Sequence, residues 1–216
     1  MNQFARLRQR MVDTQLRSRG IRDQRVLAAM LAVPREEFVS EALRHEAYDD
    51  WPQPIGAGQT ISQPFTVAYM AQAAELRGDE RILEVGTGSG YGAAVLSRLG
   101  GEVHTIERIA ALAQRAAATL DRLHYANVHV HLGDGSLGLP QDAPFDVIVV
   151  TAGAAHLPPS YPEQLADGGR IVIPIGKSTS SQHLYRFRSQ HGKLSIDDLG
   201  EFLFVPLIGD EGWHLM

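Results

Sequence analysis

Residues 81–91, Arg-Ile-Leu-Glu-Val-Gly-Thr-Gly-Ser-Gly-Tyr, decide which fold this sequence predicts. The apolar run 81–85 ends in alternating glycines, and small and apolar residues continue from Tyr91 to Leu99. A short apolar run that ends at glycines is typical of a buried strand, and the segment after it is typical of a helix. Because the first N–H groups of a helix are unpaired, a ligand can approach the backbone closely in this loop.

Strand and helix patterns alternate on the carboxyl side of this loop. We expect further strands at 102–107, 128–132, 145–150 and 169–174, and helices at 109–123 and near 162–165. Repeated strand–helix units predict an α/β, Rossmann-like fold with a doubly wound, mostly parallel sheet. The runs 184–187 and 202–205 have no helix between them, so they predict a C-terminal antiparallel hairpin whose position in the sheet stays open.

The first 78 residues predict a helical segment that precedes the α/β core. Apolar residues recur at helical spacing between Val26 and Leu31, and a second apolar helix passes through Val67 and Met70. The prolines and glycines of 51–58 cannot continue a helix, so a turn separates the two. The arginines and glutamates of the first forty residues are expected on solvated helix faces.

The composition excludes several classes of protein. The net charge of −5 disfavours binding to nucleic acid through a basic surface. The sequence has no cysteine, which excludes disulfides, thiolate nucleophiles and cysteine-bound zinc. No stretch reaches the roughly 20 apolar residues of a membrane helix, and residues 1–16 lack the apolar run of a secretory signal. We expect a cytoplasmic protein without a nucleic-acid or membrane partner.

The spacing of the glycines narrows the choice of ligand. In the dinucleotide pattern G-x-G-x-x-G, the third glycine falls on Tyr91 when counted from Gly86, and on Ala93 when counted from Gly88. Alanine is permitted there, so a nicotinamide oxidoreductase is disfavoured but stays open. The loop has no lysine for a P-loop. The hydrolase elbow G-x-S-x-G also fails around Ser89, because its outer positions are Thr87 and Tyr91 instead of glycines. The pattern E-x-G-x-G-x-G fits without adjustment and is typical of loops that bind S-adenosylmethionine.

Two acidic residues follow later strands at the expected ligand edge. Glu107 ends the second strand, where nucleoside sites place a carboxylate on ribose hydroxyls. Asp134 lies between two glycines after the third strand, and it suits either an adenine amino group or a local turn. His129 and His131 share one face of that strand, but no acid nearby in sequence completes a metal site, so we expect no metal.

Short segments spread over residues 11–213 match one known family. The most specific is Gln59-Thr60-Ile61-Ser62-Gln63-Pro64, because glycine loops occur throughout methyltransferases and this element does not. The other matching segments are 11–12, 15–16, 19–21, 33–36, 47–48, 54–56, the glycine loop through Tyr91, 107–108, 133–135, 143–146, 151–152 and 204–207. With these segments the sequence resembles the protein-L-isoaspartate O-methyltransferase family in its bacterial form.

The resemblance implies transfer of a methyl group from S-adenosylmethionine to the free α-carboxylate of L-isoaspartyl residues in damaged proteins and peptides. The ester then collapses to a succinimide, which begins repair, and S-adenosylhomocysteine is the other product. The resemblance assigns Ser62 as the active-site residue, with Thr60 and Ile61 beside it at the substrate carboxylate. The residues implied on the cofactor side are Gly56, Ala57, Gly58, Gln59, Glu84, Gly86, Thr87, Gly88, Ser89, Gly90, Glu107, Asp134 and Gly135.

The resemblance also bears on the organisation of the chain. We expect a single methyltransferase domain over 1–216 that acts as a monomer, in which 1–78 covers the substrate and 79–216 binds the cofactor. Gly92 and Gly153 depart from the residues common in the family, which concerns fine substrate preference rather than the reaction.

The implied chemistry agrees with the residues present. A carboxylate is ionised near pH 7 and a sulfonium is a strong electrophile, so alignment and exclusion of water suffice without a triad or a metal. Ser62 would orient the carboxylate through its hydroxyl, and its competing role is the N-cap of the next helix. The alternative functions are a methyltransferase with another acceptor, a cofactor-binding protein without catalysis, and the oxidoreductase.

Overall fold

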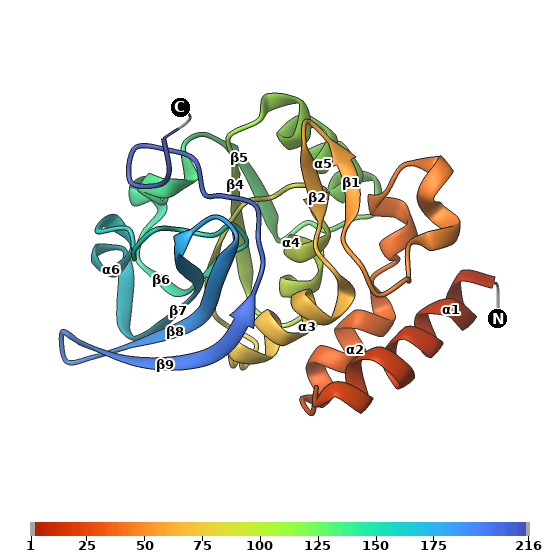
Figure 1. Cartoon of the computed structure of the whole chain (residues 1–216), viewed down its shortest axis with the longest axis horizontal. Helices are drawn as coiled ribbons and strands as arrows, with labels where there is room; N and C mark the ends of the chain where they lie inside the picture. Colours follow the sequence, from red (N-terminus) through yellow and green to blue (C-terminus); the bar gives the residue numbers. More distant parts are fainter. Residues whose placement is uncertain (1–2, 215–216) are drawn as a thin grey trace.

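The computed structural model describes residues 3–214, and within them one seven-stranded sheet carries the fold (Figure 1). Its strands are β3 (Arg81–Val85), β4 (Glu102–Glu107), β5 (Val128–Leu132), β6 (Phe145–Val150), β7 (Leu165–Ser178), β8 (Ser181–Gln190) and β9 (Lys193–Phe202), in the spatial order β5-β4-β3-β6-β7-β8-β9. In this order, the strands from β5 to β7 run parallel to one another. β8 pairs antiparallel with β7, and β9 pairs antiparallel with β8. The predicted Rossmann-like fold is confirmed.

The helices begin and end where local chemistry favours it. They are α1 (Gln3–Met11), α2 (Gln24–Ala32), α3 (Pro64–Ala73), α4 (Tyr91–Leu96), α5 (Ala110–Arg122) and α6 (Ser160–Glu163), with shorter helical turns at Val12–Leu16, Arg17–Arg19, Arg35–Phe38, Glu41–Glu46, Gly135–Leu137 and Pro140–Asp142. The carboxylate of Asp23 accepts from the N–H groups of Arg25 and Val26 and so caps α2. Pro64 opens α3, where its missing N–H costs nothing.

Two strand predictions differ from the structure. The turn-rich stretch contains an unpredicted hairpin of β1 (Gln53–Gly56) and β2 (Gln59–Ile61). The C-terminal antiparallel arrangement is confirmed, but its last strand is β9 rather than 202–205. The residues of β9 are almost all exposed, so this edge strand has no apolar run that a sequence pattern would reveal.

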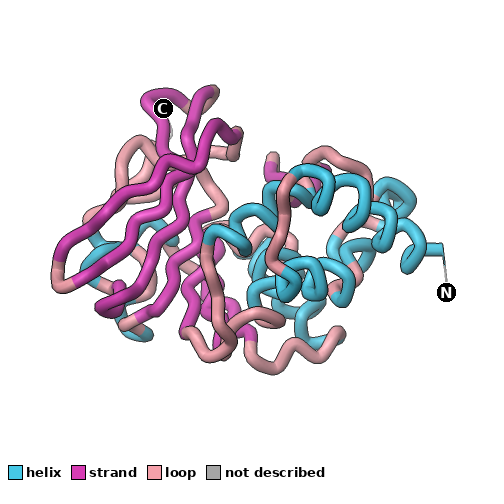
Figure 2. Tube along the Cα trace, turned by 90° about the horizontal axis from the view of Figure 1, so that it is seen from below, coloured by secondary structure: helices cyan, strands magenta, loops and turns pink. Residues whose placement is uncertain are grey.

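The N-terminal helices share a hydrophobic core with the sheet and lie to one side of it (Figure 2). Leu27 and Met30 of α2 belong to the same buried cluster as Val103 of β4 and Val147 of β6. The expected solvation of the first forty residues is wrong for Arg35, which is 0% exposed, and for its neighbour Glu36, which is also buried. None of the described helices is long and apolar enough to cross a membrane.

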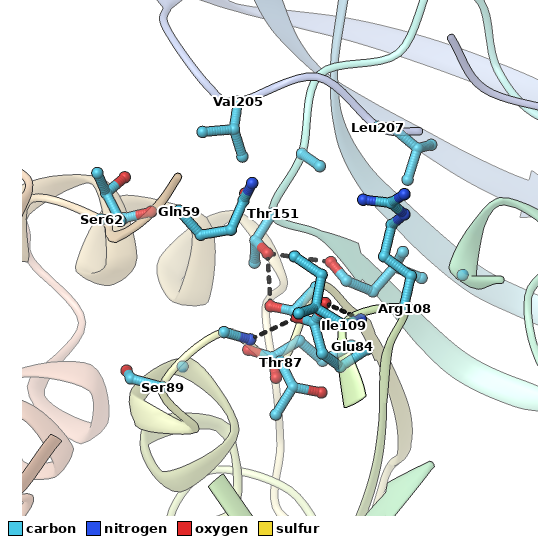
Figure 3. A pocket seen from close by; sticks show the side chains of 18 of the residues that line it. Gln59, Ser62, Glu84, Thr87, Ser89, Arg108, Ile109, Thr151, Val205 and Leu207 are labelled. Atoms are coloured by element: carbon cyan, nitrogen blue, oxygen red, sulfur yellow. Dashed lines mark hydrogen bonds between the residues drawn. The ribbon is translucent and has the colours of Figure 1, made fainter. Parts of the chain in front are cut away.

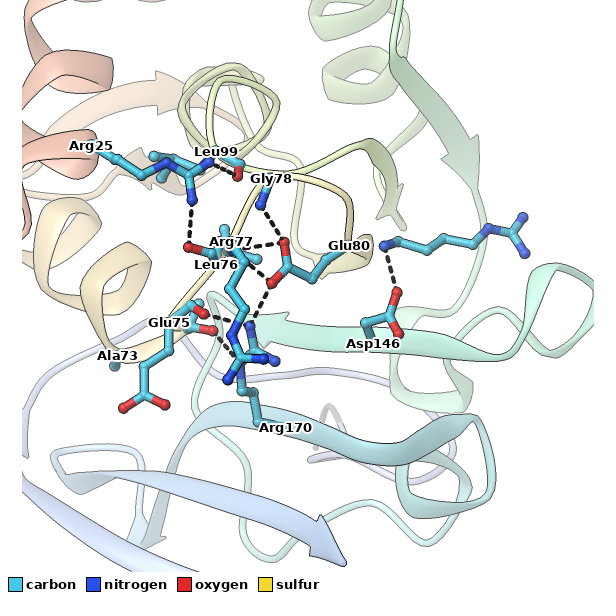
Figure 4. A network of polar contacts seen from close by, with 12 residues as sticks. Arg25, Ala73, Glu75, Leu76, Arg77, Gly78, Glu80, Leu99, Asp146 and Arg170 are labelled. Carbon is cyan, nitrogen blue, oxygen red and sulfur yellow. Dashed lines mark hydrogen bonds and ion pairs between the residues drawn. The ribbon is translucent and has the colours of Figure 1, made fainter.

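A polar network fastens the loop between α3 and β3 to its surroundings (Figure 4). The Glu80 carboxylate accepts from the backbone N–H groups of Arg77 and Gly78 and from Arg170 Nη2 at 2.9 Å. Arg25 of α2 donates to the carbonyl oxygens of Leu76 and Leu99, at 2.7 Å in each case. The network therefore joins α2, the start of β3 and β7.

Candidate active site

A cavity of about 360 Å³ lies at the carboxyl ends of β3, β4 and β6, the edge at which open α/β sheets bind ligands. Gln59 and Ser62, from the N-terminal segment, border it on one side (Figure 3). Arg108 and Leu207 border it on the opposite side. The cavity is therefore built by segments that are far apart in the sequence.

The glycine loop has a backbone that side chains would not allow. Gly86, Gly88 and Gly90 have φ angles of +96°, +54° and +89°, in the left-handed region that favours glycine. A Cβ atom at Gly86 would also lie 2.4 Å from Thr151 Oγ1. The loop consequently presents its backbone to the cavity.

Thr151, which directly follows β6, supports the loop from behind. Its hydroxyl lies 3.0 Å from the Val85 carbonyl oxygen and 2.8 Å from the Gly86 carbonyl oxygen, and donates to one of them at a time. Its backbone N–H donates to Val85 at 2.9 Å. Thr151 belongs to a segment that matches the family, but the sequence offers no local sign of this role.

Glu84 is buried beneath the loop and borders the cavity. Its Oε2 accepts from Thr105 Oγ1 at 2.6 Å, and Thr105 Oγ1 lies 2.7 Å from Thr87 Oγ1. Burial raises the pKa of Glu84 to about 8, against the hydrogen bond from Thr105 and with a smaller contribution from Glu107. Glu84 therefore stays largely protonated at neutral pH when no ligand is bound.

Glu107 ties the loop to the segment after β4. Its Oε2 accepts from Gly88 N at 3.0 Å, and its Oε1 accepts from Ile109 N at 2.9 Å. Each carboxylate oxygen has a second lone pair, so both can still accept from ligand hydroxyls. Glu107 is positioned at the cavity by backbone donors on both sides.

Asp134 has a structural role in this conformation. Its Oδ1 accepts from Ser136 N and Ser136 Oγ at 2.9 and 2.7 Å, and its Oδ2 accepts from Asp210 N at 2.8 Å. These bonds lower the pKa of Asp134 although its partial burial opposes the shift. The local-turn role is thus present, while a contact with adenine stays a prediction.

The segment from β2 to α3 carries Ser62. Among the described residues no group forms a hydrogen bond with the Ser62 hydroxyl, and the N-cap of α3 is Gln63, without a side-chain cap. Arg35 Nη2 donates to the Ser62 carbonyl oxygen at 2.8 Å. The competing N-cap role is therefore wrong, and the hydroxyl faces the cavity with its hydrogen-bonding capacity free.

The structure brings most of the predicted site residues together. Those that border the cavity are Ala57, Gln59, Thr60, Ile61, Ser62, Glu84, Gly86, Thr87, Gly88, Ser89, Glu107 and Gly135, whereas Gly56, Gly58, Gly90 and Asp134 are not part of its lining. The predicted site residues omitted other residues of the lining, among them Arg108, Thr151 and the segment 205–208.

The lining fits an S-adenosyl cofactor. The loop presents its backbone to the cavity, and a Cβ at Gly92 would lie 2.2 Å from Glu84 Oε1, so glycine there makes room for that carboxyl. Two acids, Glu84 and Glu107, match a ligand that has a positive charge and sugar hydroxyls. The apolar Ile109 and Leu207 border the rest of the space.

Comparison with known proteins gives a consistent result. The family model of protein-L-isoaspartate(D-aspartate) O-methyltransferase matches residues 6–212. Protein-L-isoaspartate O-methyltransferase 1 of Rhodopseudomonas palustris is 56% identical over 211 residues, which are 97% of this chain and 86% of the relative. Protein-L-isoaspartate O-methyltransferase 2 of Pelobacter propionicus is 53% identical over 95% of this chain and 92% of its own length.

Solved structures show the same relationship. A protein-L-isoaspartate O-methyltransferase superposes with a TM-score of 0.86 at 31% identity, over 95% of this chain and 67% of the other. A Plasmodium falciparum structure of this kind, in complex with S-adenosyl-L-homocysteine, gives a TM-score of 0.81 at 26% identity over 96% and 99% of the two chains. The chain therefore belongs to the protein-L-isoaspartate O-methyltransferase family.

Proposed function

We propose that the cavity transfers a methyl group from S-adenosylmethionine to the free α-carboxylate of an L-isoaspartyl residue, with Ser62 at the acceptor. The reaction class follows from membership of the family. The assignment of roles to residues is carried by one observation, that Ser62 and residues 86–89 of the glycine loop border the same cavity.

On the donor side, residues 86–89, Glu84 and Glu107 would hold the cofactor. S-adenosylmethionine, when bound, supplies a methyl group on a positively charged sulfur. Hydrogen bonds from Gly88 N and Ile109 N hold the Glu107 carboxylate in place, so it can accept from ribose hydroxyls without rearrangement. Burial raises the pKa of Glu84, and a cation bound beside it would lower that pKa again and favour the carboxylate.

On the acceptor side, Ser62 would donate its hydroxyl hydrogen to the substrate carboxylate, with Thr60 and Ile61 beside it. The α-carboxylate is already ionised near pH 7, so Ser62 orients it and removes no proton. Bringing carboxylate and methyl donor into line accelerates a reaction between two bound partners. The segment 205–208, which borders the cavity from the C-terminal side, would exclude water.

The test pairs two peptides that differ only in an aspartyl or isoaspartyl linkage, incubated with labelled S-adenosylmethionine. We expect base-labile label on the isoaspartyl peptide alone. Equal labelling of both peptides would support a different acceptor, and binding of S-adenosylhomocysteine without turnover would support a non-catalytic protein.

The role of Ser62 is tested with Ser62→Ala. The variant should lower kcat/KM for the isoaspartyl peptide at least about tenfold, the effect of losing one hydrogen bond to a charged group. The affinity for S-adenosylhomocysteine should stay within about twofold, because Ser62 lies on the acceptor side. Ser195→Ala, at an exposed position of β9 outside the cavity lining, is the matched control. Full turnover by Ser62→Ala would remove the assignment.

We further propose that the chain acts as a monomer in the cytoplasm on damaged proteins and peptides. Light scattering coupled to gel filtration tests the oligomeric state, and cell fractionation tests the location.

A further inference from the structure

A second cluster of polar side chains lies on the face of β4 opposite to Thr105. Side chains alternate along a strand, so Thr105 points toward the glycine loop and His104 points to the other face. His131 on β5 and Asp142 in the turn Pro140–Asp142 meet His104 on that face. The sequence predicted no metal here because no acid is near in sequence, but the fold brings Asp142 to the histidines.

The three side chains have the spacing that one metal ion requires. His104 Nδ1 lies 3.1 Å from His131 Nε2 and 3.9 Å from Asp142 Oδ1, and one ligand atom from each residue lies within 4.8 Å of the others. Two nitrogens bound tetrahedrally to zinc are roughly 3.3 Å apart, given zinc–nitrogen distances of about 2.0–2.1 Å. The imidazole pair already has this separation, and the carboxylate needs to move by about half an ångström.

The neighbours of His104 hold its ring in place, and its Nδ1 forms a hydrogen bond with His131 Nε2 that a metal ion would replace. His104 is 5% exposed and packs against the rings of His131 and Phe145, with centroids 5.3 and 5.8 Å away. Its second nitrogen, Nε2, lies 3.3 Å from Glu102 Oε2. A carboxylate on the far ring nitrogen is the usual support of a metal-bound histidine, since it fixes the tautomer and the ring plane.

The local charges leave room for a cation. With neutral histidines, the two carboxylates of Glu102 and Asp142 and the guanidinium of Arg81 carry a net charge of −1. Arg81 pairs with Glu102 at 3.2 Å and lies 3.7 Å from Asp142. Arg81 Nη2 also lies 3.1 Å from His104 Nε2. When the ring proton of His104 lies on Nε2, that nitrogen no longer accepts a hydrogen bond from Arg81. Arg81 then interacts only with the carboxylates of Glu102 and Asp142.

We propose that His104, His131 and Asp142 bind one divalent transition-metal ion, Zn²⁺ in the first instance, with water at the remaining position. Two imidazoles and a carboxylate are donors that suit this class of ion and do not suit Mg²⁺ or Ca²⁺. The ion would link β4, β5 and the turn before β6. The segments after β4 and β5 border the cavity, so the ion would brace the site without taking part in methyl transfer.

The experiment uses the full chain without an affinity tag, freed of metal with EDTA and then titrated with Zn²⁺ against a chromophoric chelator. We expect one tightly bound ion per chain, a higher melting temperature with Zn²⁺, and the visible absorption bands of four-coordinate Co²⁺ when that ion replaces it. Mg²⁺ should produce none of these changes. Absence of stoichiometric Zn²⁺ binding by the wild-type chain would overturn the proposal.

Variants then locate the ion. His131→Ala and Asp142→Asn remove partly exposed ligands and should each weaken Zn²⁺ binding at least about tenfold. His129→Gln is the matched control: it removes a neighbouring imidazole that lies 3.0 Å from Glu102 Oε1 and is not one of the three ligands. Melting temperatures in EDTA show whether each variant is folded. If His129→Gln weakened binding as much as His131→Ala, or if His131→Ala and Asp142→Asn bound Zn²⁺ normally, the assigned site would be wrong.

Discussion

At the scale of single residues, the buried cation of Arg35 holds the segment that carries Ser62. Arg35 Nε donates to the Ala47 carbonyl oxygen at 2.7 Å, and Nη2 donates to the Ser62 carbonyl oxygen at 2.8 Å. Its guanidinium stacks over Tyr91, 4.7 Å from the ring centroid. Arg35 therefore connects the start of α3 to the helix that follows the glycine loop.

We predict that Arg35→Lys impairs the acceptor side selectively, because an ammonium cannot donate to both carbonyl groups in this planar geometry. kcat/KM for the isoaspartyl peptide should fall at least about tenfold, corresponding to roughly 1.5 kcal/mol for a lost charged hydrogen bond. The affinity for S-adenosylhomocysteine should stay within about twofold. Arg122→Lys, at an exposed pair with Glu37, is the control. A parallel loss of cofactor affinity would show general unfolding instead of a positioning role.

A second prediction at this scale concerns the buried carboxyl of Glu84. Its folded-state pKa of about 8 exceeds the ordinary value of 4.5, so the folded state holds a proton that the unfolded state releases. Stability without cofactor should therefore fall as the pH rises between the two values, by up to about 1.4 kcal/mol per pH unit. Glu84→Gln should remove this slope in urea unfolding, while Glu201→Gln, whose side chain is 84% exposed, should not. An unchanged slope in Glu84→Gln would contradict the raised pKa.

At the scale of elements, the loop between α3 and β3 depends on the Glu80 carboxylate. Burial alone would raise the pKa of Glu80, but the N–H groups of Gly78 and Arg77, with Arg170, hold it below its usual value. This stabilisation is complete above the pKa of an unfolded glutamate and is lost as the pH falls through the lower folded value. The network in Figure 4 therefore weakens in acid.

We predict that Glu80→Gln lowers the free energy of unfolding by about 3 kcal/mol, since it leaves Arg170 buried without its anion. The side chains of Glu80 and Arg170 are only 7% and 11% exposed. Urea denaturation at neutral pH measures the loss. Asp13→Asn, which breaks an exposed pair with Arg17, should cost less than about 0.5 kcal/mol. Equal losses in the two variants would show that burial of the Glu80 pair is unimportant.

The elements also show what a sequence pattern is able to predict. Strands β3, β4 and β6 are almost entirely buried, and β5 alternates valine with histidine, so the residues of each strand mark it; all four lie at the predicted positions. The β1–β2 hairpin is short and contains Pro54, and β9 is exposed, so neither has a readable alternation. For the site, the glycine spacing predicts the loop itself. Arg35 and Thr151 were missed as supports because their roles depend on partners distant in sequence.

At the scale of the whole molecule, the N-terminal segment and the α/β core are joined by one hydrophobic cluster. Leu27 and Met30 pack in the cluster that contains Leu99 and Val103. Arg25 reaches across from α2 to the carbonyl oxygen of Leu99. We propose that residues 1–78 and 79–216 form a single folding unit, because neither side of this cluster would be covered without the other.

This proposal predicts one cooperative unfolding transition. Trp213 donates its indole N–H to the Gly153 carbonyl oxygen, so its fluorescence in a Trp51→Phe variant reports on the α/β core, while far-ultraviolet circular dichroism includes the N-terminal helices. The two signals should change at the same urea concentration.

Leu27→Ala, which empties a fully buried position in α2, should lower the free energy of unfolding by about 3 kcal/mol in both signals. Leu203→Ala, at a side chain that is 70% exposed, should change neither by more than about 0.5 kcal/mol. If Leu27→Ala shifted the dichroism transition and left the Trp213 transition in place, the covering segment would unfold by itself, and the segments would be two units.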